Sequence, residues 1–150
     1  MDFNIRKATK EDLPQVLDLV KELALYEKAP EEVTITLQEL EEDGFGSNPL
    51  YWIILAENEQ GILGMSFYYI RYSTWKGKCL YLEDIVVKEQ YRGHKIGKIL
   101  FEETIKAAKE MNAKLITWQV LDWNEPAINF YKKFNAELDG EWINGKLRFE

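Results

Sequence analysis

The segment that most constrains the fold is the run from Cys79 to Val87, in which hydrophobic side chains occupy both alternating faces. A strand of this kind is buried on both sides, so the pattern predicts a central β-strand with other layers packed on each face. Two adjacent carboxylates, Glu83 and Asp84, interrupt the run. Burying them costs desolvation energy unless partners compensate it, so they are candidates either for function or for salt bridges to neighbouring strands.

The rest of the chain alternates between strand-like and helix-like patterns in the order βααβββαβαβ. Thr9 and Asp12 form a capping-box pattern before the first helix. Expected strands cover 3–8, 51–57, 62–72, 79–87, 115–121 and 141–149; expected helices cover about 13–27, a short stretch containing Leu37 and Leu40, 96–111 and 126–133. No linker or repeat divides this order, so we expect a single α/β domain over residues 1–150. Its sheet should be mixed, largely antiparallel and flanked by helices.

Composition excludes several classes of function. The 150 residues, 46% of them hydrophobic, suffice for a core without disulfides or metals. The single cysteine, Cys79, is expected to be a packed residue in a reducing compartment, and the single histidine, His94, excludes a histidine-rich metal site. A net charge of −7 disfavours nucleic-acid binding. The first residues do not resemble a signal peptide and no apolar run is long enough for a membrane span, so a cytoplasmic protein is expected.

A second informative segment runs from Val86 to Lys98: a strand, a tight turn containing Arg92, Gly93 and Gly97, then a helix. Backbone N–H groups in such a turn, the positive end of the helix dipole and the nearby cations can bind an anion such as a pyrophosphate. The alternative is a glycine-containing turn with solvated lysines. The spacing matches neither a P-loop nor a dinucleotide fingerprint.

The turn Arg92-Gly-His-Lys95-Ile-Gly97 resembles the acetyl-CoA motif of the GNAT superfamily of N-acetyltransferases, Arg/Gln-x-x-Gly-x-Gly/Ala, with Lys95 where a glycine is usual. This resemblance implies a GNAT-like acyl-CoA N-acyltransferase fold and a non-covalently bound acetyl-CoA. The residues implied in binding it are Ile85, Val86, Val87, Arg92, Gly93, His94, Lys95, Ile96, Gly97, Lys98, Asn124, Pro126, Ala127 and Tyr131.

Further segments narrow the resemblance. The stretches at 21–27, 42–46, 81–84 and 123–131 are similar to the spermidine/spermine N-acetyltransferase (diamine acetyltransferase) family over almost the whole chain. Ser73 stands where the polyamine enzymes carry an acidic residue, two positions before Trp75. The run 72–77 is similar to the thialysine N-ε-acetyltransferase branch, which favours lysine-like amines. The resemblance also implies a homodimer.

Acetyl transfer to an amine requires removal of a proton, because alkylamines have a pKa near roughly 10.4. The resemblance implies Glu83 as the base and Tyr131 as the general acid for the thiolate; otherwise Tyr131 is a core aromatic. The implied acceptor-binding residues are Tyr26, Glu27, Trp75, Glu83, Asp84 and Trp123.

Direct transfer to a small primary amine is therefore the expected activity. The alternatives are an acetyltransferase for protein or peptide amines and a non-catalytic acyl-CoA-binding domain. No metal is expected in any of the three.

Overall fold

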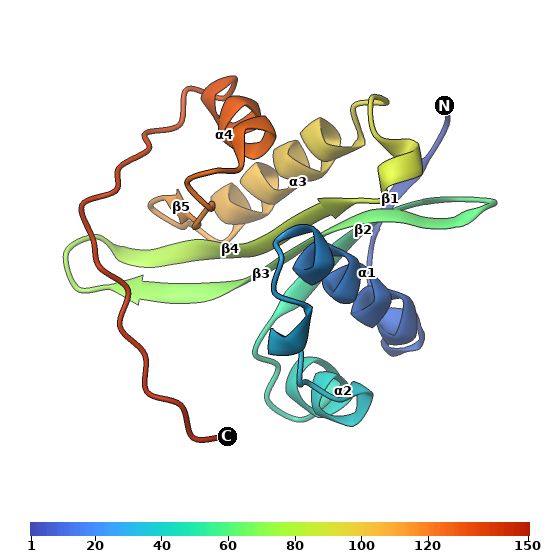
Figure 1. Cartoon of the computed structure of the whole chain (residues 1–150), viewed down its shortest axis with the longest axis horizontal. Coiled ribbons are helices and arrows are strands. Elements are labelled where there is room, and N and C mark those ends of the chain that lie inside the picture. The colour runs from blue at the N-terminus through green and yellow to red at the C-terminus, as the bar shows by residue number, and fades with distance from the viewer. The chain divides into compact units, whose positions relative to one another are not determined.

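The computed structural model describes residues 1–150 as two compact units, Met1–Gln119 and Val120–Glu150. The first unit contains a five-stranded sheet in the order β1-β2-β3-β4-β5, in which only β4 and β5 are parallel (Figure 1). The mixed, largely antiparallel α/β sheet predicted from the sequence is thus confirmed. Its strands are β1 (Asn4–Lys7), β2 (Trp52–Asn58), β3 (Gly61–Ser73), β4 (Gly77–Val87) and β5 (Ile116–Thr117).

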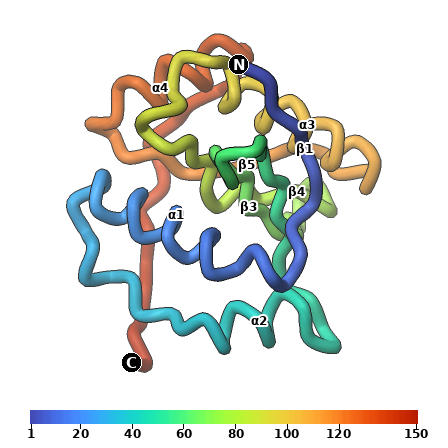
Figure 2. Tube along the Cα trace, turned by 90° about the vertical axis from the view of Figure 1, so that its right-hand side faces the viewer, coloured from blue at the N-terminus to red at the C-terminus, as the bar shows by residue number.

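Helices cover both faces of this sheet. Helices α1 (Leu13–Tyr26) and α2 (Leu37–Phe45) lie on one face, and α3 (Ile96–Glu110) lies on the other (Figures 1 and 2). Single 3₁₀ turns, η1 (Lys10–Asp12), η2 (Pro30–Glu32) and η3 (Glu89–Tyr91), connect them. The central position predicted for the Cys79–Val87 run is confirmed, because β4 lies between β3 and β5; β5 pairs with it only at Leu80 and Tyr81.

Side chains of β3 point alternately to the two faces of the sheet and contact a different helical layer on each. Met65 and Phe67 belong to the apolar cluster under α1 and α2. Ser66 points to the other face, where its hydroxyl forms a buried 2.6 Å hydrogen bond with the hydroxyl of Thr104 in α3. Thr104 in turn donates to the backbone carbonyl of Leu100. The period of two in a strand therefore supplies side chains to both helical layers.

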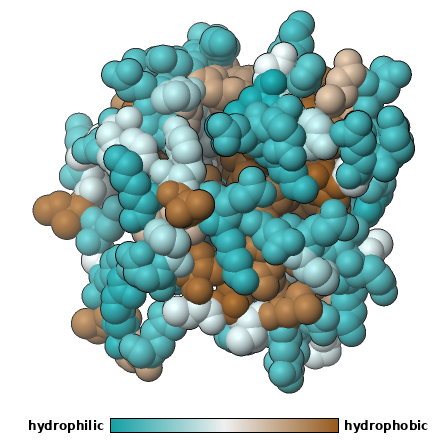
Figure 3. Space-filling view, turned by 45° about the vertical axis from the view of Figure 1, so that its right-hand side comes forward, coloured by the Kyte–Doolittle hydropathy of each residue, from teal (hydrophilic) through white to brown (hydrophobic).

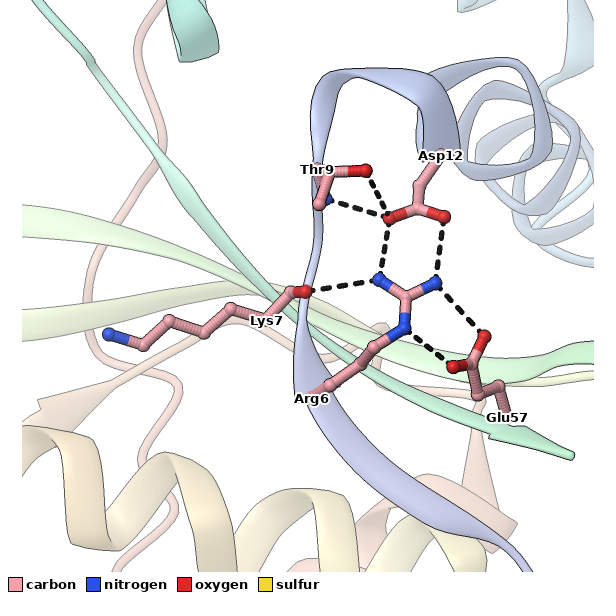
Figure 4. Close-up of polar contacts among 5 residues, drawn as sticks. All are labelled: Arg6, Lys7, Thr9, Asp12 and Glu57. Atoms are coloured by element: carbon pink, nitrogen blue, oxygen red, sulfur yellow. Dashed lines mark hydrogen bonds and ion pairs between the residues drawn. The ribbon is translucent and has the colours of Figure 1, made fainter.

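The start of α1 is fixed to the sheet edge by Arg6 (Figure 4). Its guanidinium donates to Asp12 at 2.7 and 2.9 Å and to Glu57 in β2 at 2.6 and 2.9 Å. Asp12 also accepts from the backbone N–H of Thr9 at 2.7 Å, as the predicted capping pattern requires. These contacts, led by Arg6, lower the pKa of Asp12 to about 2.

The second unit contains α4 (Glu125–Lys132), whose first turn is capped by the Asn124 side chain accepting from the Ala127 N–H at 3.3 Å. This helix confirms the prediction for 126–133. The predicted strand at 141–149 is wrong, because the residues after α4 form no helix or strand. A strand needs a ladder of backbone hydrogen bonds to a neighbouring strand, and the five-stranded sheet includes no strand from this segment. The predicted strand at 115–121 is also shortened, to β5.

No helix in the structure combines the length and the apolar character that a membrane span requires. Figure 3 shows one face of the molecule, on which most protruding side chains are hydrophilic and apolar ones lie recessed among them. Exposed aromatic residues occur in the β3–β4 hairpin and in the C-terminal segment, namely Tyr72, Trp75, Trp142 and Phe149.

Candidate active site

A β-bulge in β4 places the two carboxylates of the central strand. In the β3–β4 ladder Phe67 pairs with Asp84 and Tyr68 pairs with Leu82, so Glu83 has no partner opposite it. An extra residue of this kind re-aims the neighbouring side chains, and bulges are frequent beside active sites. Because Phe67 faces α1, its partner Asp84 faces α1 as well, and the bulge turns Glu83 toward the same side.

Two tyrosines that sequence reasoning missed lie next to these carboxylates. Tyr69 in β3 and Tyr81 in β4 are register partners with stacked rings 5.1 Å apart, centroid to centroid. The hydroxyl of Tyr69 donates to Glu83 at 3.2 Å. The register between β3 and β4 places the two tyrosines side by side. The sequence of either strand alone does not reveal this register. The site therefore combines aromatic faces with negative charge, which suits a cation.

A third carboxylate, Glu27 at the end of α1, interacts electrostatically with the other two. Burial and the charge of Glu83 raise the pKa of Glu27. Burial first, then the charges of Glu83 and Glu27, raise the pKa of Asp84 to about 7. None of the three is held in an ion pair. The structure thus brings together Glu27, Glu83 and Asp84 as predicted, and a bound cation would relieve their mutual repulsion.

The pKa of Asp84 predicts a pH-dependent stability. The folded protein binds this proton more tightly than the unfolded chain, whose carboxyl has a pKa near 3.8. The free energy of unfolding therefore falls as pH rises from about 4 to about 7. We expect Asp84→Asn to be more stable than wild type by about 1–3 kcal/mol at pH 8 and by far less at pH 4.

Urea unfolding at several pH values measures this difference. Asp18→Asn, on the exposed surface of α1, is the control and should show no such pH trend. A constant difference between Asp84→Asn and wild type from pH 4 to pH 8 would contradict the assigned pKa.

The strand–turn–helix segment has the backbone conformation of an anion site. Gly93 has φ +85°, and a Cβ added there would meet no atom within 4 Å, so the turn is open on that side. Lys95 is the N-cap of α3 and lies in the left-handed region, with φ 64° and ψ 15°. The first N–H groups of the 15-residue helix α3 have no partner within the helix. The resulting site is electropositive.

Because Lys95 carries a Cβ at a left-handed position, we expect Lys95→Gly to raise the free energy of unfolding by about 0.5–1 kcal/mol. Thermal or urea unfolding measures this change. Lys106→Gly, inside α3, is the opposite control and should lower stability by about 1 kcal/mol. A loss of stability in Lys95→Gly would show that the Lys95 side chain contributes more than its backbone strain costs.

The ring of Tyr26, at the end of α1, contacts Arg92 of the glycine turn. The guanidinium carbon of Arg92 lies 5.6 Å from the centroid of the Tyr26 ring, and Arg92 Nε donates to the Val87 carbonyl at 3.3 Å. The sequence predicts Tyr26 as an acceptor-binding residue; in the structure its ring lies against Arg92 of the glycine turn. The next residue, Glu27, belongs to the carboxylate cluster, so the end of α1 adjoins both sites.

Strands β4 and β5 separate after a short parallel ladder. Only Leu80 with Ile116 and Tyr81 with Thr117 are paired, so β4 has no neighbour on this side from Leu82 to Val87. This separation leaves the backbone near Ile85, Val86 and Val87 without strand partners on that edge.

Other predicted residues lie elsewhere. Trp75 is 84% exposed at the tip of the β3–β4 hairpin, away from the bulge along both strands. Ser73 shapes that tip, because its Oγ accepts from the N–H groups of Trp75 and Lys76. Cys79 is buried, as expected. His94 is exposed in the turn. The residues predicted after position 120 belong to the second unit, namely Trp123, Asn124, Pro126, Ala127 and Tyr131.

A bulged central strand beside a glycine turn and a helix N-terminus is an arrangement suited to acyl transfer from a phosphate-bearing donor. The Acetyltransferase (GNAT) family model matches residues 13–136, and the chain belongs to this family. It is therefore an acetyltransferase enzyme, as the motif resemblance predicted.

Two curated relatives support the narrower resemblance. The thialysine N-epsilon-acetyltransferase of Bos taurus is 40% identical over 141 residues, covering 89% of this chain and 83% of the relative. The human spermidine/spermine N(1)-acetyltransferase-like protein 1 is 37% identical over 89% of this chain, which corresponds to 20% of that protein. An aminoglycoside acetyltransferase from an uncultured soil metagenomic sample has a TM-score of 0.80 and 18% identity over 97% of both chains, a likeness of fold alone.

Proposed function

We propose that the protein transfers the acetyl group of acetyl-CoA directly to the primary amine of a small cationic acceptor. The acceptor class comprises lysine analogues such as thialysine, diamines and polyamines. One observation carries this proposal: Glu27, Glu83 and Asp84 converge without a cation, beside the stacked rings of Tyr69 and Tyr81. Carboxylates and aromatic faces both attract an ammonium group.

The residues present fit acetyl-CoA. The open side of Gly93 and the unpaired N–H groups at the start of α3 suit phosphate oxygens, as does Arg92. The unpaired edge of β4 near Ile85–Val87 suits an amide-containing arm that hydrogen-bonds like a strand. When bound, this cofactor supplies an acetyl group activated as a thioester.

The chain's own residues then move the protons. Glu83 is the proposed base that removes a proton from the acceptor ammonium, directly or through one water. Asp84, whose pKa is about 7, can hold or release a proton close to neutral pH. Tyr131 is the proposed general acid and gives its Oη proton to the leaving group. Glu27 and Asp84 hold the cationic acceptor before the reaction.

The proposal is tested by following free thiol release from acetyl-CoA with purified protein. The acceptors are spermidine, putrescine, lysine, thialysine and a lysine-containing peptide. We expect a preference for a small amine. Turnover confined to the peptide would move the assignment to protein acetylation. No turnover despite acetyl-CoA binding would indicate a binding domain.

We also propose a homodimer. The C-terminal segment exposes most of the surface of Trp142, Ile143, Leu147 and Phe149, and apolar side chains gathered in one exposed segment are typical of an interaction site. Light scattering of the full chain measures its mass in solution. A mass equal to one chain at all concentrations would contradict the dimer.

A further inference from the structure

The hydroxyl of Thr117 in β5 is buried and has no hydrogen-bond partner in the protein. Nearly all buried hydroxyl groups in proteins have a partner, because an unpaired one loses its interaction with water and gains nothing in return. A group of this kind therefore indicates either a bound water or a ligand that completes it.

The sheet register shows which site Thr117 faces. Thr117 is the parallel partner of Tyr81, so the two side chains lie on the same face of the sheet. Tyr81 stacks on Tyr69, and Tyr69 donates to Glu83. Trp118, the residue directly after β5, has the opposite orientation, because its ring meets Phe101 of α3 edge-on with centroids 5.6 Å apart. Thr117 therefore lies on the same face of the sheet as Tyr69, Tyr81 and Glu83, one strand further along the sheet.

Thr117 also stands at the last ladder position before β4 and β5 separate. The edge of β4 that becomes unpaired there is the one proposed to hold the cofactor arm. A hydroxyl at this point lies between the proposed acceptor site and the proposed cofactor edge. The hydroxyl oxygen can accept a hydrogen bond but carries no charge. It therefore suits the amine of the acceptor, which changes from a charged ammonium to a neutral amine during the reaction.

We propose that Thr117 is an acceptor-binding residue whose Oγ1 accepts a hydrogen bond from an N–H group of the primary amine substrate. This inference rests on the proposed function and deepens it, because it adds a neutral contact to the three carboxylates. The site then binds the amine both before and after its deprotonation, since the carboxylates favour the cation and the hydroxyl accepts from either form.

Thr117→Val and Thr117→Ser test the proposal. Valine removes an unpaired buried hydroxyl, so we expect Tm to be unchanged or raised by about 2–4 °C. The same variant should lower kcat/KM for the preferred amine about 3- to 10-fold, the effect of one lost hydrogen bond, with the Kd for acetyl-CoA within about two-fold of wild type. Serine keeps the hydroxyl and should retain kcat/KM within about two-fold.

Thr104→Val is the matched control. Its hydroxyl is already bonded to Ser66 and to the Leu100 carbonyl, so its loss should lower Tm and leave kcat/KM unchanged. A lowered Tm and an unchanged kcat/KM for Thr117→Val would overturn the inference and assign the hydroxyl to a structural water. In that case the wild type remains active, whereas a wild type inactive on every amine would overturn the proposed function itself and this inference with it.

Discussion

Replacing Glu83 with glutamine should lower kcat about 10²- to 10⁴-fold, the range expected when a general base is removed. Glutamine keeps the size of the side chain and can still bond the Tyr69 hydroxyl, but it cannot take a proton from the acceptor. The measurement is steady-state thiol release from acetyl-CoA at saturating amine, together with the pH profile of kcat. The Kd for acetyl-CoA should change little, because Glu83 lies at the bulge of β4 and not in the glycine turn.

Glu102→Gln is the control, since Glu102 is exposed on α3 and should be dispensable. Asp84→Asn completes the set. A large loss of kcat in Asp84→Asn with normal kcat in Glu83→Gln would transfer the role of base to Asp84, whose pKa of about 7 already suits proton exchange near neutral pH. Normal kcat in both variants would exclude Glu83 and Asp84 as the base.

Replacing Tyr131 with phenylalanine should also lower kcat about 10²- to 10⁴-fold, because the ring is retained while the proton donor is lost. Tyr131 belongs to α4, where its ring meets Phe130 edge-on with centroids 5.3 Å apart. This packing depends on the ring and not on the hydroxyl, so the helix should be preserved. The measurement is kcat for the preferred amine, with Tm as the check on folding.

Tyr72→Phe is the matched control, because Tyr72 is 75% exposed in β3 and its hydroxyl should not affect the reaction. A Tyr131→Phe variant that keeps wild-type kcat would remove Tyr131 from the mechanism. A fall in both Tm and kcat would instead indicate that the hydroxyl supports the fold.

Carboxylates occupy two contrasting environments in this protein. The two ion pairs of Arg6 hold carboxylates that stabilise the fold, and they keep the pKa of Asp12 low. The carboxylates at the bulge lack such partners, and the pKa of Asp84 rises. The same chemical group therefore has a lowered pKa where a cation is built in and a raised pKa where none is.

Local patterns predicted most of the fold because they reflect local physics. The apolar run Cys79–Val87 predicts a central strand and the pattern from Ile96 predicts a helix, and the structure has β4 and α3 there. The carboxylates Glu83 and Asp84 were identifiable because charge is rare in a buried strand. The strand predicted for 141–149 is wrong because strand formation also depends on distant parts of the chain. Its alternation permits a strand, but a strand exists only with a neighbour, and that depends on the rest of the structure.

By itself, the sequence determined the central strand, the glycine turn before the helix, the two adjacent carboxylates and the family resemblance, because each depends on residues close together in the chain. Only the tertiary structure decided the bulge at Glu83, the stacking of Tyr69 on Tyr81 and the unpaired hydroxyl of Thr117. It also decided the contact of the Tyr26 ring with Arg92. These features depend on the register between strands and on where a helix ends, and a one-residue shift in register would turn every side chain to the other face.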